Sequence, residues 1–166
     1  MITLDIEKAF DSIWHNGLLH KLFVFKFPFY LTKMVQSFLI KRSYYVNIDG
    51  SSSPNFPLPA GVPQGSALSP TLYNIYTSDL QLPTKVELAQ FADDTCIFSS
   101  HRKPSVIINN LQSGINCLSD YYKKWRIKVN NDKTSAVFFT RRRVERYLPQ
   151  SNINIDNVEV NWNNPL

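Results

Sequence analysis

Several short stretches of the chain alternate apolar and polar residues with a period of two, which is typical of a strand with one buried face. The first is residues 2–6, where three aliphatic residues alternate with Thr3 and Asp5. A second leads from Tyr44 into the turn signal Asp49-Gly50. Further strands are predicted on either side of the polar tip 92–95, at 137–139 and, with weaker alternation, at 152–162.

Apolar residues spaced three or four apart predict amphipathic helices between these strands. The clearest helix begins at Pro104, and its apolar stripe is Ile107, Leu111, Ile115, Leu118, Tyr122 and Trp125. Shorter helices are predicted after Asp11 or Ser12, either of which suits an N-cap, from Pro28 to Leu39, and from Ser69-Pro70 onward. Residues 51–65 are rich in proline and glycine, which predicts a loop.

The order of these elements mixes helices and strands without strict alternation. Such an order favours an α+β fold, in which helices pack on one face of a largely antiparallel sheet. The length of 166 residues is typical of one domain, and the sequence contains no internal repeat or low-complexity segment. We therefore expect residues 1–166 to form a single domain, with 141–166 as the least clearly assigned part.

Composition narrows the possible function classes. A hydrophobic fraction of 43% and a charged fraction of 19% exclude a disordered tail, a collagen-like chain and a coiled coil. The net charge of +5 is compatible with nucleic acid as a partner, although the basic runs 123–128 and 141–143 are equally compatible with a solvated surface. Two cysteines favour a reduced intracellular compartment, and the most apolar stretch, 22–31, is too short to span a bilayer, so no membrane partner is expected.

Two adjacent carboxylates, Asp93 and Asp94, lie between apolar strand residues, where Asp is usually depleted. Taken alone they are compatible with an ordinary turn, since Asp hydrogen-bonds its own backbone there. Asp5 lies at the end of the first strand, on the face opposite Leu4 and Ile6, and would join them if that strand lies beside the hairpin. Carboxylates so close repel each other unless a cation lies between them, and Mg²⁺ suits hard oxygen ligands.

Two further segments have features of ligand-binding sites. Residues 61–66 contain two glycines, which allow a backbone to approach a ligand closely, and Gln64, which offers both a donor and an acceptor. Lys133 lies in a polar run directly before a predicted strand. Taken alone, the first segment is compatible with an ordinary turn-rich loop and the second with an ordinary surface lysine.

In this order, the segments resemble the reverse transcriptases of non-LTR retrotransposons, LINE-type elements of the jockey-like group. Residues 4–11 (LDIEKAFD) look like motif A, 61–70 (GVPQGSALSP) like motif B, 91–94 (FADD) like motif C and 125–134 (WRIKVNNDKT) like motif D. The spacer SFLIKRSYYV between the first two is also similar. The resemblance implies the palm of a right-handed polymerase, an RNA-directed DNA polymerase.

The resemblance implies a role for each matching residue near the reaction. Asp5, Asp93 and Asp94 would be the catalytic carboxylates, and with the carbonyl of Ile6 they would bind two Mg²⁺ ions, for which Mn²⁺ can substitute. Such ions would support attack of a primer 3′-hydroxyl on the α-phosphate of a dNTP, with pyrophosphate leaving. Lys133 would match the motif D lysine, a proton donor to that pyrophosphate.

The resemblance also implies contacts with the nucleotide and the nucleic acid. Phe10 would be the aromatic gate beneath the sugar, where a ring crowds a 2′-hydroxyl and favours dNTP over NTP. Gln64 and Gly65 would line the nucleotide pocket. Contacts with the RNA template and the DNA primer are expected at Gly61, Pro63, Arg141 and Arg142.

The resemblance further implies parts of a parent protein outside this chain. The fingers, thumb and endonuclease of such elements have no counterpart here, so the chain is expected to be a palm fragment, inactive on its own. One departure is Lys26, where the family usually has glycine at a predicted helix end. The alternatives are a non-catalytic nucleic-acid-binding remnant, a plain α+β domain with coincidental motifs, and an RNA-directed RNA polymerase, against which Ala92 and Phe10 argue.

Overall fold

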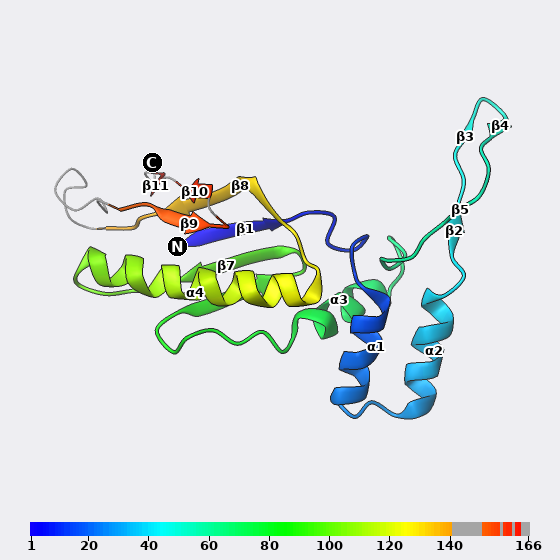
Figure 1. The fold of residues 1–166 in the computed structure, drawn as a ribbon, viewed down its shortest axis with the longest axis horizontal. Coiled ribbons are helices and arrows are strands. Elements are labelled where there is room, and N and C mark those ends of the chain that lie inside the picture. The colour runs from blue at the N-terminus through cyan, green and yellow to red at the C-terminus, as the bar shows by residue number, and fades with distance from the viewer. Residues whose placement is uncertain (141–150, 157, 161, 164–166) are drawn as a thin grey trace. The chain divides into compact units, whose positions relative to one another are not determined.

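The alternating stretch at the start of the chain forms β1 (Ile2–Ile6), the middle strand of a five-stranded sheet (Figure 1). The computed structural model describes residues 1–140, 151–156, 158–160 and 162–163. The chain folds as two compact units, one formed by Met1–Glu7 and Leu80–Leu166 and the other by Lys8–Asp79. The predicted α+β class, with a largely antiparallel sheet, is confirmed.

The sheet of the first unit has the order β11-β8-β1-β7-β6. Its other strands are β6 (Glu87–Phe91), β7 (Asp94–Phe98), β8 (Val129–Val137) and β11 (Trp162–Asn163). β1 pairs antiparallel with both β7 and β8, and only the short pairing of β11 with β8 is parallel. The strand predicted at 137–139 lies earlier in the chain. The observed strand, β8, has nine residues and ends at Val137, where the predicted strand begins.

One face of this sheet packs against α4 (Pro104–Trp125), whose bounds agree with the prediction (Figure 1). Five of the six predicted stripe residues are buried, and Ile107 is partly exposed. A Cβ added at Gly114 would lie 3.1 Å from the Val86 side chain and 3.5 Å from Ile97, so this glycine permits close packing of helix on sheet. Alternation along β1 directs Ile2, Leu4 and Ile6 into the core.

The weakly alternating segment near the end of the chain forms a hairpin and a short separate strand. The hairpin consists of β9 (Ile153–Ile155) and β10 (Val158–Val160). It is attached to α4 by two hydrogen bonds, since Gln112 Nε2 donates to the Asn154 carbonyl and the Asn154 amide donates to Gln112 Oε1. The predicted single strand at 152–162 is therefore three shorter strands.

The second unit contains α1 (His15–Val24), α2 (Phe29–Leu39) and α3 (Ser69–Thr77). Between α2 and α3 lie four two-residue strands, β2 (Ser43–Tyr44) paired with β5 (Phe56–Pro57), and β3 (Asn47–Ile48) paired with β4 (Ser51–Ser52). Asp49 and Gly50 have φ of 48° and 82°, as in a type I′ hairpin turn. The predicted turn is confirmed, whereas the expected loop 51–65 contains two strands.

An ion pair between a buried lysine and a partly exposed aspartate joins α1 to the residues just after α3. Lys21 is 1% exposed, and its ammonium group donates to the Asp79 carboxylate and to the Tyr76 carbonyl. A buried ammonium without its partner would be strongly unfavourable, so this pair constrains how the helices of the second unit can pack.

The end of α1 has the geometry that the sequence predicted at Lys26. Lys26 has φ of 57°, the left-handed conformation that favours glycine. Its amide donates to the Phe23 carbonyl, and the Phe27 amide donates to the Leu22 carbonyl, which is the hydrogen-bond pattern of a Schellman motif. The chain therefore has a side chain at the position where this motif prefers none.

We expect Lys26→Gly to raise the free energy of unfolding by about 1 kcal/mol, because glycine adopts the left-handed conformation without strain. Urea denaturation followed by circular dichroism measures this change. The matched control is Lys33→Gly inside α2, which should lower stability by about 1 kcal/mol. A Lys26→Gly variant no more stable than the parent would contradict the assignment of strain at this helix end.

Candidate active site

Asp93 lies in the tight turn that joins β6 to β7. Phe91 pairs with Asp94, so the connecting loop is only Ala92 and Asp93. Ala92 has φ of 53°, a conformation that costs a residue with a side chain about 1 kcal/mol or more. The predicted hairpin with a polar tip is confirmed, and its backbone is strained directly beside the carboxylates.

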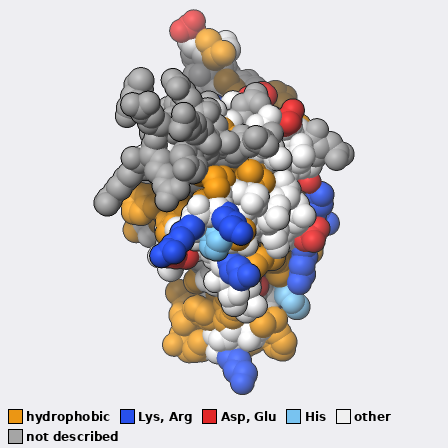
Figure 2. All heavy atoms as spheres, turned by 90° about the vertical axis from the view of Figure 1, so that its left-hand side faces the viewer, with side chains coloured by type: hydrophobic (Ala, Val, Ile, Leu, Met, Phe, Trp, Pro, Cys, Tyr) orange, Lys and Arg blue, Asp and Glu red, His pale blue; other side chains and the backbone are white. Residues whose placement is uncertain are grey.

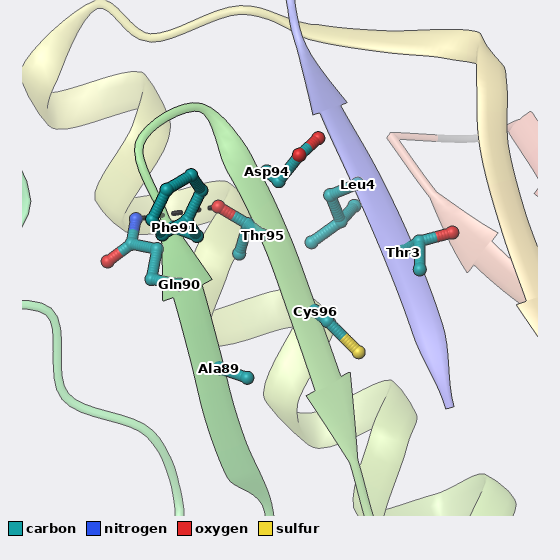
Figure 3. Close-up of a pocket in the computed structure, with 8 residues that line it drawn as sticks. All are labelled: Thr3, Leu4, Ala89, Gln90, Phe91, Asp94, Thr95 and Cys96. Atoms are coloured by element: carbon teal, nitrogen blue, oxygen red, sulfur yellow. Dashed lines mark hydrogen bonds between the residues drawn. The ribbon is translucent and has the colours of Figure 1, made fainter.

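Asp5 and Asp94 lie on neighbouring strands at the same end of the sheet. In the β1–β7 ladder Leu4 is opposite Thr95, and continuing the register by one residue places Asp5 beside Asp94. Leu4 and Thr95 are both buried, so the two carboxylates lie on the other, more open face. Figure 3 shows the Asp94 carboxylate directed toward β1. The prediction that Asp5 joins Asp93 and Asp94 depended on the first strand lying beside the hairpin. The structure has this pairing.

These carboxylates do not form a closed metal cage. In the described part of the chain, no three His, Cys, Asp or Glu residues are placed so as to hold a metal ion together. Asp5 and Asp93 are partly exposed and Asp94 is exposed, so water and phosphate oxygens have access to them. An open set of hard oxygen donors fits Mg²⁺, which usually keeps several waters and binds through few carboxylates plus substrate phosphates.

A shallow cavity of about 290 Å³ lies beside the carboxylates on the sheet (Figure 3). Its lining residues are Thr3, Leu4, Ala89, Gln90, Phe91, Asp94, Thr95 and Cys96. The side chains of Ala89, Cys96 and Thr3 share one row across three strands, and Thr3 Oγ1 lies 2.7 Å from the Ser135 hydroxyl on the next strand. This row of small side chains leaves room over the sheet next to Asp94.

Polar residues lie beneath the hairpin as well. Thr95 is 2% exposed, and its hydroxyl accepts a hydrogen bond of 3.4 Å from Gln90 Nε2. Burial raises the pKa of the Tyr122 hydroxyl on α4, and the Thr95 side chain partly offsets this rise. Thr95 and Tyr122 are both buried, so polar groups lie in the layer between α4 and the strand that carries Asp94.

Lys133 lies in an irregular part of β8 opposite the end of β1. Thr3 pairs with Ser135 and Asp5 pairs with Asn130, so β8 has three more residues than β1 between the same two pairs. Such an insertion makes a bulge and can direct a side chain out of the regular sheet. Lys133 is exposed within this bulge, three residues from the partner of Asp5.

Basic residues also gather at the opposite end of the sheet, near the start of α4. Lys85 and His101 line a polar cavity of about 360 Å³, and Arg102 and Lys103 follow directly in the sequence. Figure 2 shows Lys and Arg side chains around a His on this side. The sequence did not indicate this group, because Lys85 lies 16 positions before the short run of His101, Arg102 and Lys103.

In the second unit, the predicted loop 61–66 is fixed to the segment that follows β1. The Gly61 amide donates to the Ile13 carbonyl, and the Val62 amide donates to the Phe10 carbonyl. Gly61 has φ of 84°, and a Cβ there would lie 2.6 Å from the Asp11 carbonyl oxygen. Only glycine fits at this position. The Gly61 carbonyl in turn accepts hydrogen bonds from Arg42 Nη1 and His15 Nε2.

Two side chains predicted near the nucleotide have defined partners in this unit. The Phe10 ring packs against Tyr73, with 5.3 Å between ring centroids. Gln64 Nε2 donates to both carboxylate oxygens of Asp11, at 3.0 and 3.1 Å. Asp11 does not cap α1 as expected, since that helix begins at His15 without a side-chain cap. The sequence did not indicate this contact between Asp11 and a predicted site residue, because the two lie 53 positions apart.

The predicted site residues are divided between the two units. The first unit carries Asp5, Ile6, Asp93, Asp94 and Lys133, and the second carries Phe10, Gly61, Pro63, Gln64 and Gly65. The boundary falls between Glu7 and Lys8, inside the segment 4–11 that holds residues of both groups. Arg141 and Arg142, expected at the template and primer, lie outside the described residues.

Comparison with known proteins shows a match over nearly the whole chain. Residues 1–160 match the family described as reverse transcriptase (RNA-dependent DNA polymerase). The chain is 37% identical, over 84% of its length, to the RNA-directed DNA polymerase from mobile element jockey of Drosophila melanogaster, and 34% identical, over 86%, to the probable RNA-directed DNA polymerase from transposon X-element. It spans 16% of the length of each of these relatives.

Solved structures with a similar fold include two telomerases. The apo telomerase from Candida tropicalis, truncated from its C-terminal domain, has a TM-score of 0.59 at 19% identity, over 80% of this chain and 29% of that one. The telomerase from Candida albicans, in complex with a fragment of telomeric RNA, has a TM-score of 0.61 at 16% identity, over 96% and 30%. None of the helices in the described segments is long and apolar enough to cross a membrane.

Cys96 provides a chemical test of the open sheet face. Burial raises the pKa of its thiol, so less thiolate is present near pH 8 than for an ordinary cysteine. In a Cys117→Ser background, we expect the rate of alkylation by iodoacetamide to keep rising with pH beyond the ordinary thiol range. Mass spectrometry against pH measures this rate. A midpoint at or below the ordinary thiol pKa would contradict the described burial.

Proposed function

Because the chain belongs to the reverse transcriptase (RNA-dependent DNA polymerase) family, we propose that the sheet end carrying Asp5, Asp93 and Asp94 is the centre of DNA synthesis on an RNA template. The observation that supports this proposal most is the β1–β7 register, which places Asp5 beside Asp94 with Asp93 in the adjoining turn. The reaction is transfer of a nucleotide from a dNTP to a primer 3′-hydroxyl, with release of pyrophosphate.

Two Mg²⁺ ions, or Mn²⁺ in their place, would be held mainly by Asp5 and Asp93, together with the carbonyl of Ile6. Asp94 would be the third carboxylate of this metal-binding group. When bound, the ions supply charge stabilisation for the attacking and leaving oxygens. The protein would hold the carboxylates in place. Pairing of β1 with β7 sets Asp5 relative to Asp94, and the tight turn at Ala92 sets Asp93 beside Asp94. The carboxylates fit this role because water and phosphate oxygens have access to them.

The second unit would contribute the nucleotide pocket. The Phe10 ring, packed against Tyr73, would lie beneath the sugar and crowd a 2′-hydroxyl. Gln64 and Gly65 would line the pocket, on a loop whose backbone is held by Gly61 and Val62. Gly61 and Pro63 would contact template and primer, as their position in the segment 61–70 suggests. Arg141 and Arg142 would do so through their positive charge.

Lys133 would donate a proton to the leaving pyrophosphate. Its support is its exposed place in the bulge of β8, near the strand partner of Asp5. A lysine that protonates a leaving group must come within hydrogen-bond reach of it. A bulge suits this role because it can direct a side chain out of the regular sheet.

We propose that residues 1–166 act as the palm of a larger intracellular polymerase. The relatives are about six times longer than the matched segment, and the fingers, thumb and endonuclease would be supplied by other parts of the parent protein. RNA template, DNA primer and dNTP are the proposed partners, and the isolated chain is expected to lack polymerase activity.

Mg²⁺ should raise the melting temperature of the chain. At ten times the dissociation constant the gain in stability is about 1.4 kcal/mol, which corresponds to roughly 3–5 °C at this size. Differential scanning fluorimetry with Mg²⁺ or Mn²⁺ measures the shift. Asp93→Ala should remove it, whereas Asp120→Ala, at an exposed position on α4, should retain it. A shift that persists in Asp93→Ala would place metal binding elsewhere. Binding of RNA that persists without metal and in Asp93→Asn would favour a non-catalytic remnant.

Phe10→Ala should relax sugar selection in the parent polymerase. Removal of the ring opens space for a 2′-hydroxyl, so the ratio of dNTP to NTP incorporation should fall by about tenfold or more. Single-nucleotide primer extension with each nucleotide type measures the ratio. Because the ring contacts Tyr73, Phe10→Leu serves as a control that retains apolar packing and most of the bulk. An unchanged ratio in Phe10→Ala would refute the gate assignment.

A further inference from the structure

We infer that Asp11 is a positioning residue that orients the amide of Gln64, so that Gln64 presents a hydrogen-bond acceptor to the bound nucleotide. This inference rests on the proposed function. Its basis is the contact between the two side chains, in which Gln64 Nε2 lies 3.0 and 3.1 Å from the two oxygens of the Asp11 carboxylate.

The chemistry of the pair determines which end of the amide faces Asp11. An ionised carboxylate accepts hydrogen bonds and donates none, so it pairs with the NH₂ end of the amide and repels the carbonyl end. The Gln64 carbonyl oxygen, Oε1, therefore points away from Asp11. Without the carboxylate, both orientations of the amide would be available, because its two ends have almost the same shape.

The backbones of both residues are held close together, which makes the contact a stable one. The Val62 amide donates to the Phe10 carbonyl on one side of the pair, and Gly61 packs directly against the Asp11 backbone. On the other side, the Ser69 hydroxyl donates to the Pro63 carbonyl at 2.6 Å. Asp11 and Gln64 are each flanked by fixed neighbours, although both side chains are exposed and accessible to a ligand.

An outward-facing acceptor selects for a donor on the nucleotide. In a nucleotide whose base is paired with the template, the imino N–H is taken up by the base pair. Two kinds of donor remain, the 3′-hydroxyl of the sugar and the exocyclic amine of adenine, cytosine or guanine. Of the substrates, ddTTP has neither group, so it provides an internal reference.

The experiment uses single-nucleotide incorporation by the full-length parent polymerase. Asp11→Asn is the main variant, because its side-chain amide can still bond Gln64 but lets the Gln64 amide turn its NH₂ group outward. We expect the KM for dNTP to rise about fivefold to tenfold with kcat within about twofold, as for loss of one hydrogen bond that contributes equally to ground state and transition state. Asp120→Ala is the matched control and should leave both constants unchanged.

Two combinations separate positioning from a general structural role. In a Gln64→Ala background, Asp11→Asn should add nothing further to KM, because its effect acts through Gln64. The double variant D11N/Q64E should recover most of the original KM, since it restores both the side-chain bond and an outward acceptor. Full additivity with Gln64→Ala, or no recovery in the double variant, would overturn the inference.

The nucleotide series identifies the donor. If it is the 3′-hydroxyl, Asp11→Asn will raise the KM of dTTP but not of ddTTP. If it is the exocyclic amine, the KM of dATP, dCTP and dGTP will rise and that of dTTP will not. An equal rise for all nucleotides including ddTTP, or no rise for any, would overturn the inference.

Asp93→Asn in the same enzyme separates this inference from the proposed function. Loss of incorporation in Asp93→Asn, combined with an unchanged KM in Asp11→Asn, would refute the role of Asp11 alone. Incorporation that survives in Asp93→Asn would refute the proposed active site itself. A melting curve for each variant confirms that it is folded.

Discussion

The pairing of β1 between β7 and β8 is the constraint on which the rest of the first unit depends. Hydrogen bonds on both sides of this strand set the register that brings Asp5 next to Asp94. The same register directs Ile2 and Leu4 toward α4, so core and site are specified by one alternation. A slip of one residue would expose the aliphatic side chains and bury a carboxylate, and both changes are strongly unfavourable.

The sequence was most informative where a period or a turn signal was long and uninterrupted. The bounds of α4 and β1 agree with prediction because several turns of helix, or a full alternation, each supply repeated signals. The same reasoning placed β8 too late, because the bulge around Lys133 breaks the period of two. Strands of two residues, such as β4, span a single period of alternation and therefore give no repeated signal.

For the site, sequence patterns indicated residue types but not all of their contacts. Asp93 and Asp94 stand out because Asp is depleted in strands, and the structure places Asp93 in a tight turn and Asp94 at the start of β7. Asp11 gave the signal of a helix cap, yet its carboxylate accepts from Gln64. This contact joins residues 53 positions apart, so no local pattern in the sequence could indicate it.

The wide separation of β1 from its partners along the chain has a consequence for how the protein forms during synthesis. Thr3 and its partner Ser135 are 132 residues apart, so at a synthesis rate of about 5–20 residues per second β1 waits roughly 7–26 s before β8 is made. During that interval an aliphatic strand has no completed sheet to join, and contacts so distant in sequence form slowly even afterwards. The strand that organises the sheet is thus made long before its pairing with β8 can be completed. Its exposure in the nascent chain makes this protein a candidate for chaperone assistance.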